Sequence, residues 1–122
     1  MFFKKKSNSN IDTALDKKIK ELHSERVATA YVIRERAKNV IICNGAIDIY
    51  PEGADKEAAR VKAENAKKLL LCSIGHYDDL RRQYLEALAE NGERNTTALW
   101  TKECMTSHEW VEMAYKEFWE IN

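Results

Sequence analysis

Residues 54–91 read ADKEAARVKAENAKKLLLCSIGHYDDLRRQYLEALAEN, and apolar or small side chains recur in them at alternating steps of three and four. This spacing is typical of a helix that packs lengthwise against a partner helix. Alanine in the first half allows close approach, whereas Leu and Tyr in the second half need more space. The predicted seam consists of Ala59, Ala63, Ala66, Leu70, Ser73, Tyr77, Leu80, Tyr84 and Leu88.

Gly75 lies inside this segment and leaves two interpretations open. An interior glycine costs a helix about 1 kcal/mol relative to alanine. Gly75 could therefore end one helix, with Asp78 and Asp79 in the first turn of the next, where the helix dipole favours carboxylates. The seam continues across Gly75 without a change of phase. We therefore expect one continuous or gently kinked helix, about 55 Å long at about 1.5 Å per residue.

The rest of the chain also favours helices. One Pro, four Gly and 33% charged residues among 122 are typical of a single all-α domain. A first helix is predicted from Ile11 to about Cys43, and a last helix after Asn91-Gly92. We expect an elongated bundle of three to four helices over residues 10–122, preceded by a flexible basic tail over residues 1–9. The stripe of the first helix consists of Ile11, Leu15, Ile19, Leu22, Val27, Tyr31, Ala37 and Val40.

Two helix boundaries have alternatives. Asn44-Gly45 lies between two apolar segments and suits either a helix end or the type I′ turn of a hairpin. A short β-hairpin at residues 40–50 is thus the alternative to a helix that ends there. Thr106-Ser107-His108-Glu109 matches a capping box, which would divide the last segment by starting a new helix.

Two cysteine–histidine pairs share one spacing. Cys72 and His76, like Cys104 and His108, are four residues apart, so each pair would lie on one helix face. Two facing pairs would supply the Cys2His2 ligands of a tetrahedral zinc site. In straight antiparallel helices the two cysteines would lie about 12 Å apart along the axis, so zinc requires a kink or break. The sequence favours the alternative, with no cofactor and both cysteines buried as small apolar residues.

No pattern in the chain points to catalysis. A Cys–His dyad needs a cleft and an orienting group, and the sequence has neither a phosphate-binding Gly-rich loop nor a Glu-x-x-His pair. No apolar run approaches the length of a membrane span, and the N-terminus does not have the pattern of a signal peptide. The three cysteines suggest no disulfide framework. We expect a cytoplasmic protein that is not an enzyme.

Apolar side chains outside the seams predict an interaction surface. They favour a small helical interaction or regulatory protein that binds another protein or a second copy of itself, for example as a homodimer. The Lys- and Asn-rich N-terminus would suit a bacterial or phage accessory factor. The candidate contact residues are Ile47, Ile49, Tyr50, Trp110 and Trp119.

Nucleic-acid binding is the second choice. Residues 1–70 hold 15 Lys and Arg against 10 Asp and Glu, whereas residues 71–122 hold 5 against 10. A basic face attracts phosphates, but no aromatic residues alternate with these cations as in a single-strand platform. The candidate contacts are Lys4, Lys5, Lys6, Lys17, Lys18, Arg34 and Arg36.

Overall fold

The computed structural model describes residues 2–90 and 105–121, with side chains described for residues 14–90 and 105–119. Within these ranges the chain forms three helices and no strand: α1 (Phe2–Ile47), α2 (Ala54–Glu90) and α3 (Ser107–Ile121). The prediction of an all-α chain is confirmed. The segment from which a fourth helix would come, residues 91–104, lies outside the described residues. The division into a tail over residues 1–9 and a domain over residues 10–122 stays a prediction, although α1 begins at Phe2.

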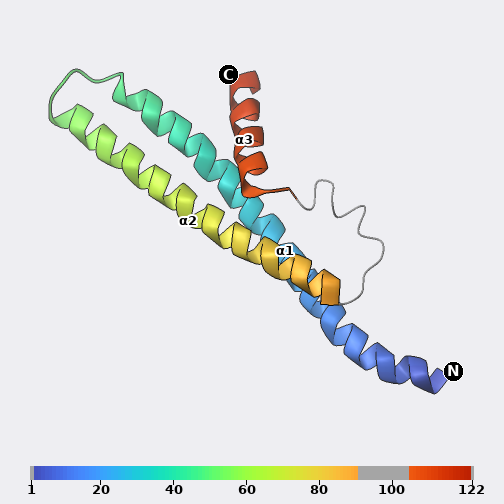
Figure 1. Ribbon diagram of the computed structural model, residues 1–122. Helices are drawn as coiled ribbons and strands as arrows, with labels where there is room; N and C mark the ends of the chain where they lie inside the picture. Colours follow the sequence, from blue (N-terminus) through green and yellow to red (C-terminus); the bar gives the residue numbers. More distant parts are fainter. Residues whose placement is uncertain (1, 91–104, 122) are drawn as a thin grey trace.

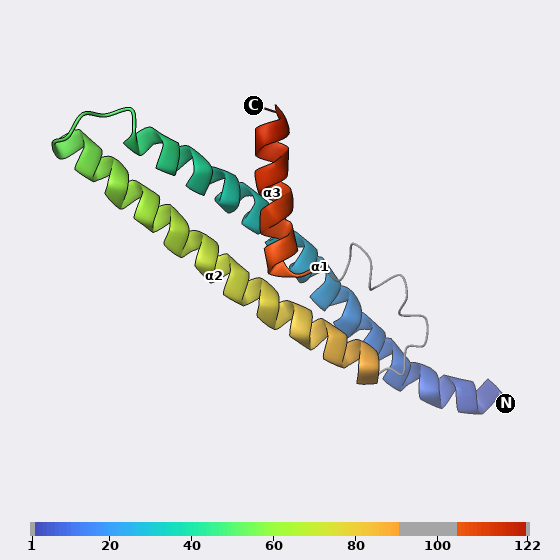
Figure 2. The same cartoon turned by 45° about the horizontal axis from the view of Figure 1, so that its top comes forward.

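The helices α1 and α2 form a long antiparallel hairpin, and α3 crosses α1 near its middle (Figure 1). The C-terminal end of α3 points away from the hairpin (Figure 2). In keeping with this arrangement, α3 packs mainly on α1 and touches α2 little. The fold is therefore a two-helix rod with a short third helix docked on one side.

The α2 seam follows the sequence prediction. Every predicted seam residue from Ala63 to Leu88 is buried, and Ala59 is half-buried near the helix start. The helix passes through Gly75 without a break. Gly75 is exposed, and a Cβ atom added there would meet no atom within 4 Å. Packing therefore does not require glycine at this position, and the continuous helix that we expected is confirmed.

In α1, the buried stripe differs from the predicted one. The prediction passes through Val27 and Tyr31, but Tyr31 is 60% exposed and Val27 is only half-buried. The reason is Arg26, which lies in the core although charged residues are mostly exposed. The predicted stripe has a step of five from Leu22 to Val27, whereas the step of four from Leu22 to Arg26 keeps the buried stripe in helical phase. The residues that α1 buries are Leu22, Arg26, Thr29, Ala30, Ile33, Ala37, Val40 and Cys43.

The alternative of a β-hairpin at residues 40–50 is wrong. The helix α1 continues through Asn44-Gly45 to Ile47. Val40 and Cys43 lie on the helical stripe that packs against α2, and Ile47 packs against the same cluster. This spacing of three and four places all three side chains on one helix face, whereas alternation in a strand would place Val40 and Cys43 on opposite faces.

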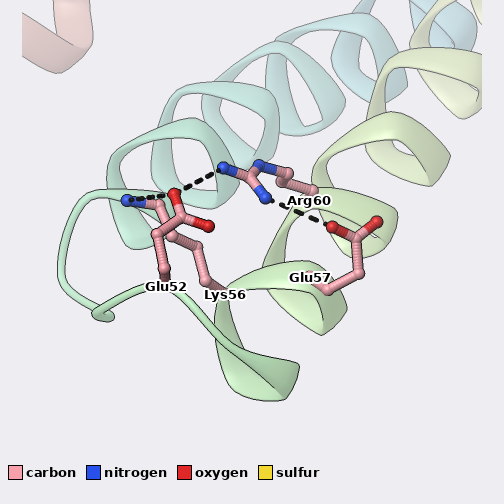
Figure 3. Close-up of polar contacts among 4 residues, drawn as sticks. All are labelled: Glu52, Lys56, Glu57 and Arg60. Atoms are coloured by element: carbon pink, nitrogen blue, oxygen red, sulfur yellow. Dashed lines mark hydrogen bonds and ion pairs between the residues drawn. The ribbon is translucent and has the colours of Figure 1, made fainter.

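Charged side chains lie around the start of α2. The turn residue Glu52 accepts a hydrogen bond from Arg60 Nη2 at 3.1 Å and lies 3.7 Å from Lys56 Nζ (Figure 3). Arg60 also donates to Glu57 at 3.2 Å, and this hydrogen bond is the main cause that raises the pKa of Arg60. Gly53, with φ of 147°, supplies the backbone conformation that precedes the helix. Exposed pairs of this kind contribute little to stability.

The apolar core is divided along the hairpin. A three-helix cluster joins all three helices through Ile33 of α1, Tyr77 of α2 and Ala114 of α3, among others. A two-helix cluster joins Leu22 of α1 to Leu80, Tyr84, Ala87 and Leu88 of α2. On α1, Arg26 lies midway between Leu22 of one cluster and Ala30 of the other.

Candidate functional site

A buried arginine lies between the two clusters. Arg26 is 1% exposed, and its Nη1 donates to Tyr77 Oη at 3.4 Å. Its Nη2 lies 3.0 Å from His23 Nδ1, and its Cζ lies 4.9 Å from the centroid of the Tyr84 ring. Because arginine only donates hydrogen bonds, Nδ1 of His23 is the acceptor and the ring proton of the neutral imidazole is on Nε2. The guanidinium thus connects one tyrosine from each cluster.

In the described part of the chain, this buried cation pairs with no carboxylate. Among the described side chains, none of the ion pairs includes Arg26. Its Nε has no hydrogen-bond acceptor within the described residues either. A buried arginine is normally paired, and an unsatisfied buried donor costs about 1–3 kcal/mol. Arg26 is therefore a costly residue for packing alone, and its surroundings are the first place to look for a ligand.

A cavity of about 200 Å³ lies beside Arg26, between α1 and the first turn of α3. Arg34 also lines it, and its Nε is the second buried donor without an acceptor among the described side chains. The Cζ atom of Arg34 lies 5.5 Å from the centroid of the Tyr31 ring. We refer to this space as the Arg26–Arg34 cavity. Its lining residues are His23, Arg26, Val27, Ala30, Tyr31, Arg34 and Trp110.

Tyr77 fixes the first turn of α3 beside this cavity. Its hydroxyl donates to the carbonyl oxygen of Met105 at 2.5 Å and accepts from Trp110 Nε1 at 2.9 Å. The predicted capping box is confirmed: Glu109 N donates to Thr106 Oγ1 at 3.2 Å, and Thr106 N donates to Glu109 Oε1 at 3.1 Å. The hydrogen bond from the Thr106 amide is the main cause that lowers the pKa of Glu109. Trp110 is thereby held against the cavity.

Further along α3, an ion-pair cluster holds the helix to α1. Glu117 Oε2 accepts from Arg34 Nη2 at 2.5 Å and lies 3.4 Å from Lys38 Nζ. The hydrogen bond from Arg34 is the main cause that lowers the pKa of Glu117. Ala114, one helical turn earlier, is fully buried. Together these contacts give the inner face of α3 both an apolar and a charged attachment to α1.

The predicted metal ligands do not form a cluster in the described part of the chain. Cys72, His76 and His108 are exposed, and His108 Nε2 lies 2.9 Å from Glu112 Oε1. Cys104 lies outside the described residues. Within residues 14–90 and 105–119, no group of three possible ligands comes together. The expectation that Cys72 is buried is wrong, because Cys72 is exposed and points away from the seam. The prediction of no cofactor and its alternative, zinc binding, both stay predictions.

The residues predicted to form the interaction surface fall into two classes. Ile47 and Trp110 are half-buried and pack against the three-helix cluster. Ile49, Tyr50 and Trp119 are 77%, 41% and 68% exposed. Of these five residues, only the second class exposes a large part of its surface to a partner. Its members lie at two separate places, the α1–α2 connection and α3 (Figure 1).

The predicted nucleic-acid contacts also differ from one another. Lys17 and Lys18 are exposed on α1. Arg34 is held by Glu117, and Arg36 Nη1 donates to the carbonyl oxygen of Leu69 at 2.9 Å and to the hydroxyl of Ser73. The side chains of Lys4, Lys5 and Lys6 lie outside the described residues. Nucleic-acid binding stays a prediction, now with fewer available cations.

Comparisons with known proteins identify no relative of this chain. The sequence matched no protein-family model, no curated protein and no solved structure. In the described part of the chain, no helix has the length and apolar character needed to cross a membrane. Evidence for function therefore comes from the residues and their geometry.

Proposed function

We propose that this protein is a non-enzymatic helical interaction module that binds another protein, or a second copy of itself, through the outer face of α3. The observation that carries the proposal is the exposure of Trp119, 68%, together with Tyr115, 36%, one helical turn away. Trp and Tyr are the residue types that contribute most often to binding energy at protein interfaces. Phe118 packs edge-on against Trp119, with ring centroids 5.3 Å apart.

The attachment of α3 supports this proposal. Ala114 and Glu117 anchor the inner face of the helix to α1. The position of the outer face is therefore set before a partner arrives. A surface that is ordered in advance loses less conformational entropy on binding, so the aromatic pair suits a specific contact.

Sedimentation equilibrium over a range of protein concentrations tests whether the partner is a second copy. If it is, Trp119→Ser should weaken the dimer by about 30-fold or more, since a central interface Trp contributes about 2 kcal/mol or more. Leu71→Ser is the control, because Leu71 is also a large apolar residue, 65% exposed, but lies on α2. It should leave the dimer unchanged.

A different partner requires a second measurement. The photo-crosslinking residue p-benzoylphenylalanine is placed at position 119, or at position 71 as the control, and cells that normally make the protein are irradiated. A product that forms from position 119 and not from position 71 would support the proposal. A monomer at every concentration, with no product specific to position 119, would refute it.

A further inference from the structure

We propose that the Arg26–Arg34 cavity is a binding site for a small organic carboxylate, whose charged group is held by the two arginines and whose apolar body lies against Tyr31 and Trp110. This inference concerns a different surface from the outer face of α3 and does not depend on the proposed function.

The charge of the site calls for an anion. Arg26 is 1% exposed, and among the described side chains it has no carboxylate partner, while the Nε–H groups of Arg26 and Arg34 are both buried without an acceptor there. Glu117 is the carboxylate that faces Arg34, and it is shared with Lys38. Of the two arginines that line the cavity, Arg34 thus shares a carboxylate with Lys38, and Arg26 pairs with none among the described residues. A ligand anion would supply the missing acceptor and the missing charge.

The shape and the planar donors favour a carboxylate over a bare inorganic anion. Guanidinium groups present coplanar N–H donors that match the two oxygens of a carboxylate. The rest of the lining is mainly apolar, including Val27, Ala30 and the rings of Tyr31 and Trp110. An inorganic anion would leave these apolar walls without a contact, whereas a flat hydrocarbon body would cover them.

The volume limits the size of the ligand. At about 200 Å³, the cavity is smaller than sites for drug-sized ligands, which measure about 300–1,000 Å³. A single aromatic ring with one carboxylate is of the appropriate size. His23 adds a further donor, because its Nδ1 accepts from Arg26 and its ring proton is therefore on Nε2.

The test is an NMR titration of the full ¹⁵N-labelled chain with benzoate. We expect saturable shifts of the Trp110 indole N–H signal, which Trp110→Phe identifies, and of amides near Ala30. Benzyl alcohol keeps the ring without the charge, and inorganic phosphate keeps charge without the ring. Each should bind about tenfold or more weakly than benzoate, as expected when one charge-assisted contact or one apolar body is lost.

Variants locate the site. Arg34→Lys keeps the charge that faces Glu117 but loses the planar donors, and Arg26→Met keeps most of the volume without the charge. Each variant should weaken the binding of benzoate by about tenfold or more. If Arg26→Met fails to fold, Val27→Phe replaces it, since a larger side chain at this half-buried lining position should fill the cavity. Arg82→Gln is the control, because Arg82 is an exposed arginine of α2 that does not line the cavity.

The outcomes are decisive in both directions. Saturable benzoate binding that Arg34→Lys weakens and Arg82→Gln leaves within about twofold would support the site. Absence of saturable shifts, equal binding of phosphate or benzyl alcohol, or equal weakening by Arg82→Gln would overturn it. Because bound ligand stabilises the folded state, the melting temperature should also rise with benzoate in the parent and not in Arg34→Lys.

Discussion

Replacing Tyr77 by Phe removes one oxygen from the point where the three helices meet. The ring of Tyr77 is fully buried, and Phe would retain its packing. The lost hydroxyl donates to the Met105 carbonyl at 2.5 Å and accepts from Trp110 Nε1 at 2.9 Å and from Arg26 Nη1 at 3.4 Å. The substitution would therefore leave one carbonyl and two N–H groups without these partners.

The burial of the three partner groups determines how far Tyr77→Phe should lower the free energy of unfolding. A buried polar group without a partner costs about 1–3 kcal/mol. Met105 and Trp110 are only half-buried, so water can partly replace the hydroxyl that their hydrogen bonds lose. The loss of each of these two hydrogen bonds should cost about 1 kcal/mol or slightly more. The 3.4 Å contact from Arg26 is weak and adds less. We expect Tyr77→Phe to lower the free energy of unfolding by about 2–4 kcal/mol.

Two assays check this expectation. Urea unfolding should show a lower midpoint with an unchanged m-value, since the folded and unfolded surfaces are nearly the same. Amide hydrogen exchange should accelerate most in α3, because Tyr77 is the link between α2 and Met105 and Trp110 at the start of that helix. The melting temperature should fall by on the order of 10 °C.

Tyr50→Phe is the control, because Tyr50 is 41% exposed at the α1–α2 connection. Surface substitutions of this kind usually change stability by about 0.5 kcal/mol or less. If Tyr77→Phe changes the free energy of unfolding no more than Tyr50→Phe, the three hydrogen bonds do not hold α3. If the loss is large but exchange accelerates evenly over all helices, Tyr77 stabilises the whole fold and the specific link to α3 is refuted.

Three further changes test the local structure. Gly75→Ala should stabilise the protein by about 0.5–1 kcal/mol in thermal unfolding, because the position is helical, exposed and sterically open; a loss of stability would show that α2 is not continuous there. Thr106→Ala should cost about 1 kcal/mol by loss of the cap of α3, and Thr106→Ser should not. Glu117→Gln should destabilise at neutral pH by about 0.5–1 kcal/mol. Because the pKa of Glu117 is lowered in the folded protein, its contribution to stability is fully present above the unfolded pKa of about 4.3. The difference in unfolding free energy between Glu117→Gln and the parent should therefore vanish as pH falls through the folded pKa. A difference that is independent of pH would contradict the charged contact with Arg34.

The α2 seam was predictable because a single regular pattern decides it. From Ala63 to Leu88 the apolar and small residues keep one phase, and the structure buries every predicted position. The unchanged phase also indicated that the helix continues through Gly75, since a new helix would have no reason to continue the same stripe. The capping box of Thr106 and Glu109 was predictable for a similar reason, because both halves of the motif are local.

The stripe of α1 and the cavity could not be predicted in the same way. Charged residues are mostly exposed, so Arg26 was left out of the predicted stripe. The prediction passed through Val27 and Tyr31 instead. The signal was present, since Arg26 lies four residues from both Leu22 and Ala30. Its partner Tyr77 is 51 positions away in the chain, and no local pattern shows that contact. The cavity additionally requires Trp110, whose position depends on how α3 docks.

The position of Arg26 constrains the hairpin whether or not a ligand binds. Its guanidinium must reach Tyr77 of the three-helix cluster and the ring of Tyr84 of the two-helix cluster at once. A slip of α2 by one turn, about 5.4 Å, would separate Arg26 from at least one of these tyrosines and leave the cation buried without that contact. An apolar residue would pack at this level without such a requirement. Arg26 therefore selects the register of α1 against α2, and through Tyr77 the same register sets where α3 begins.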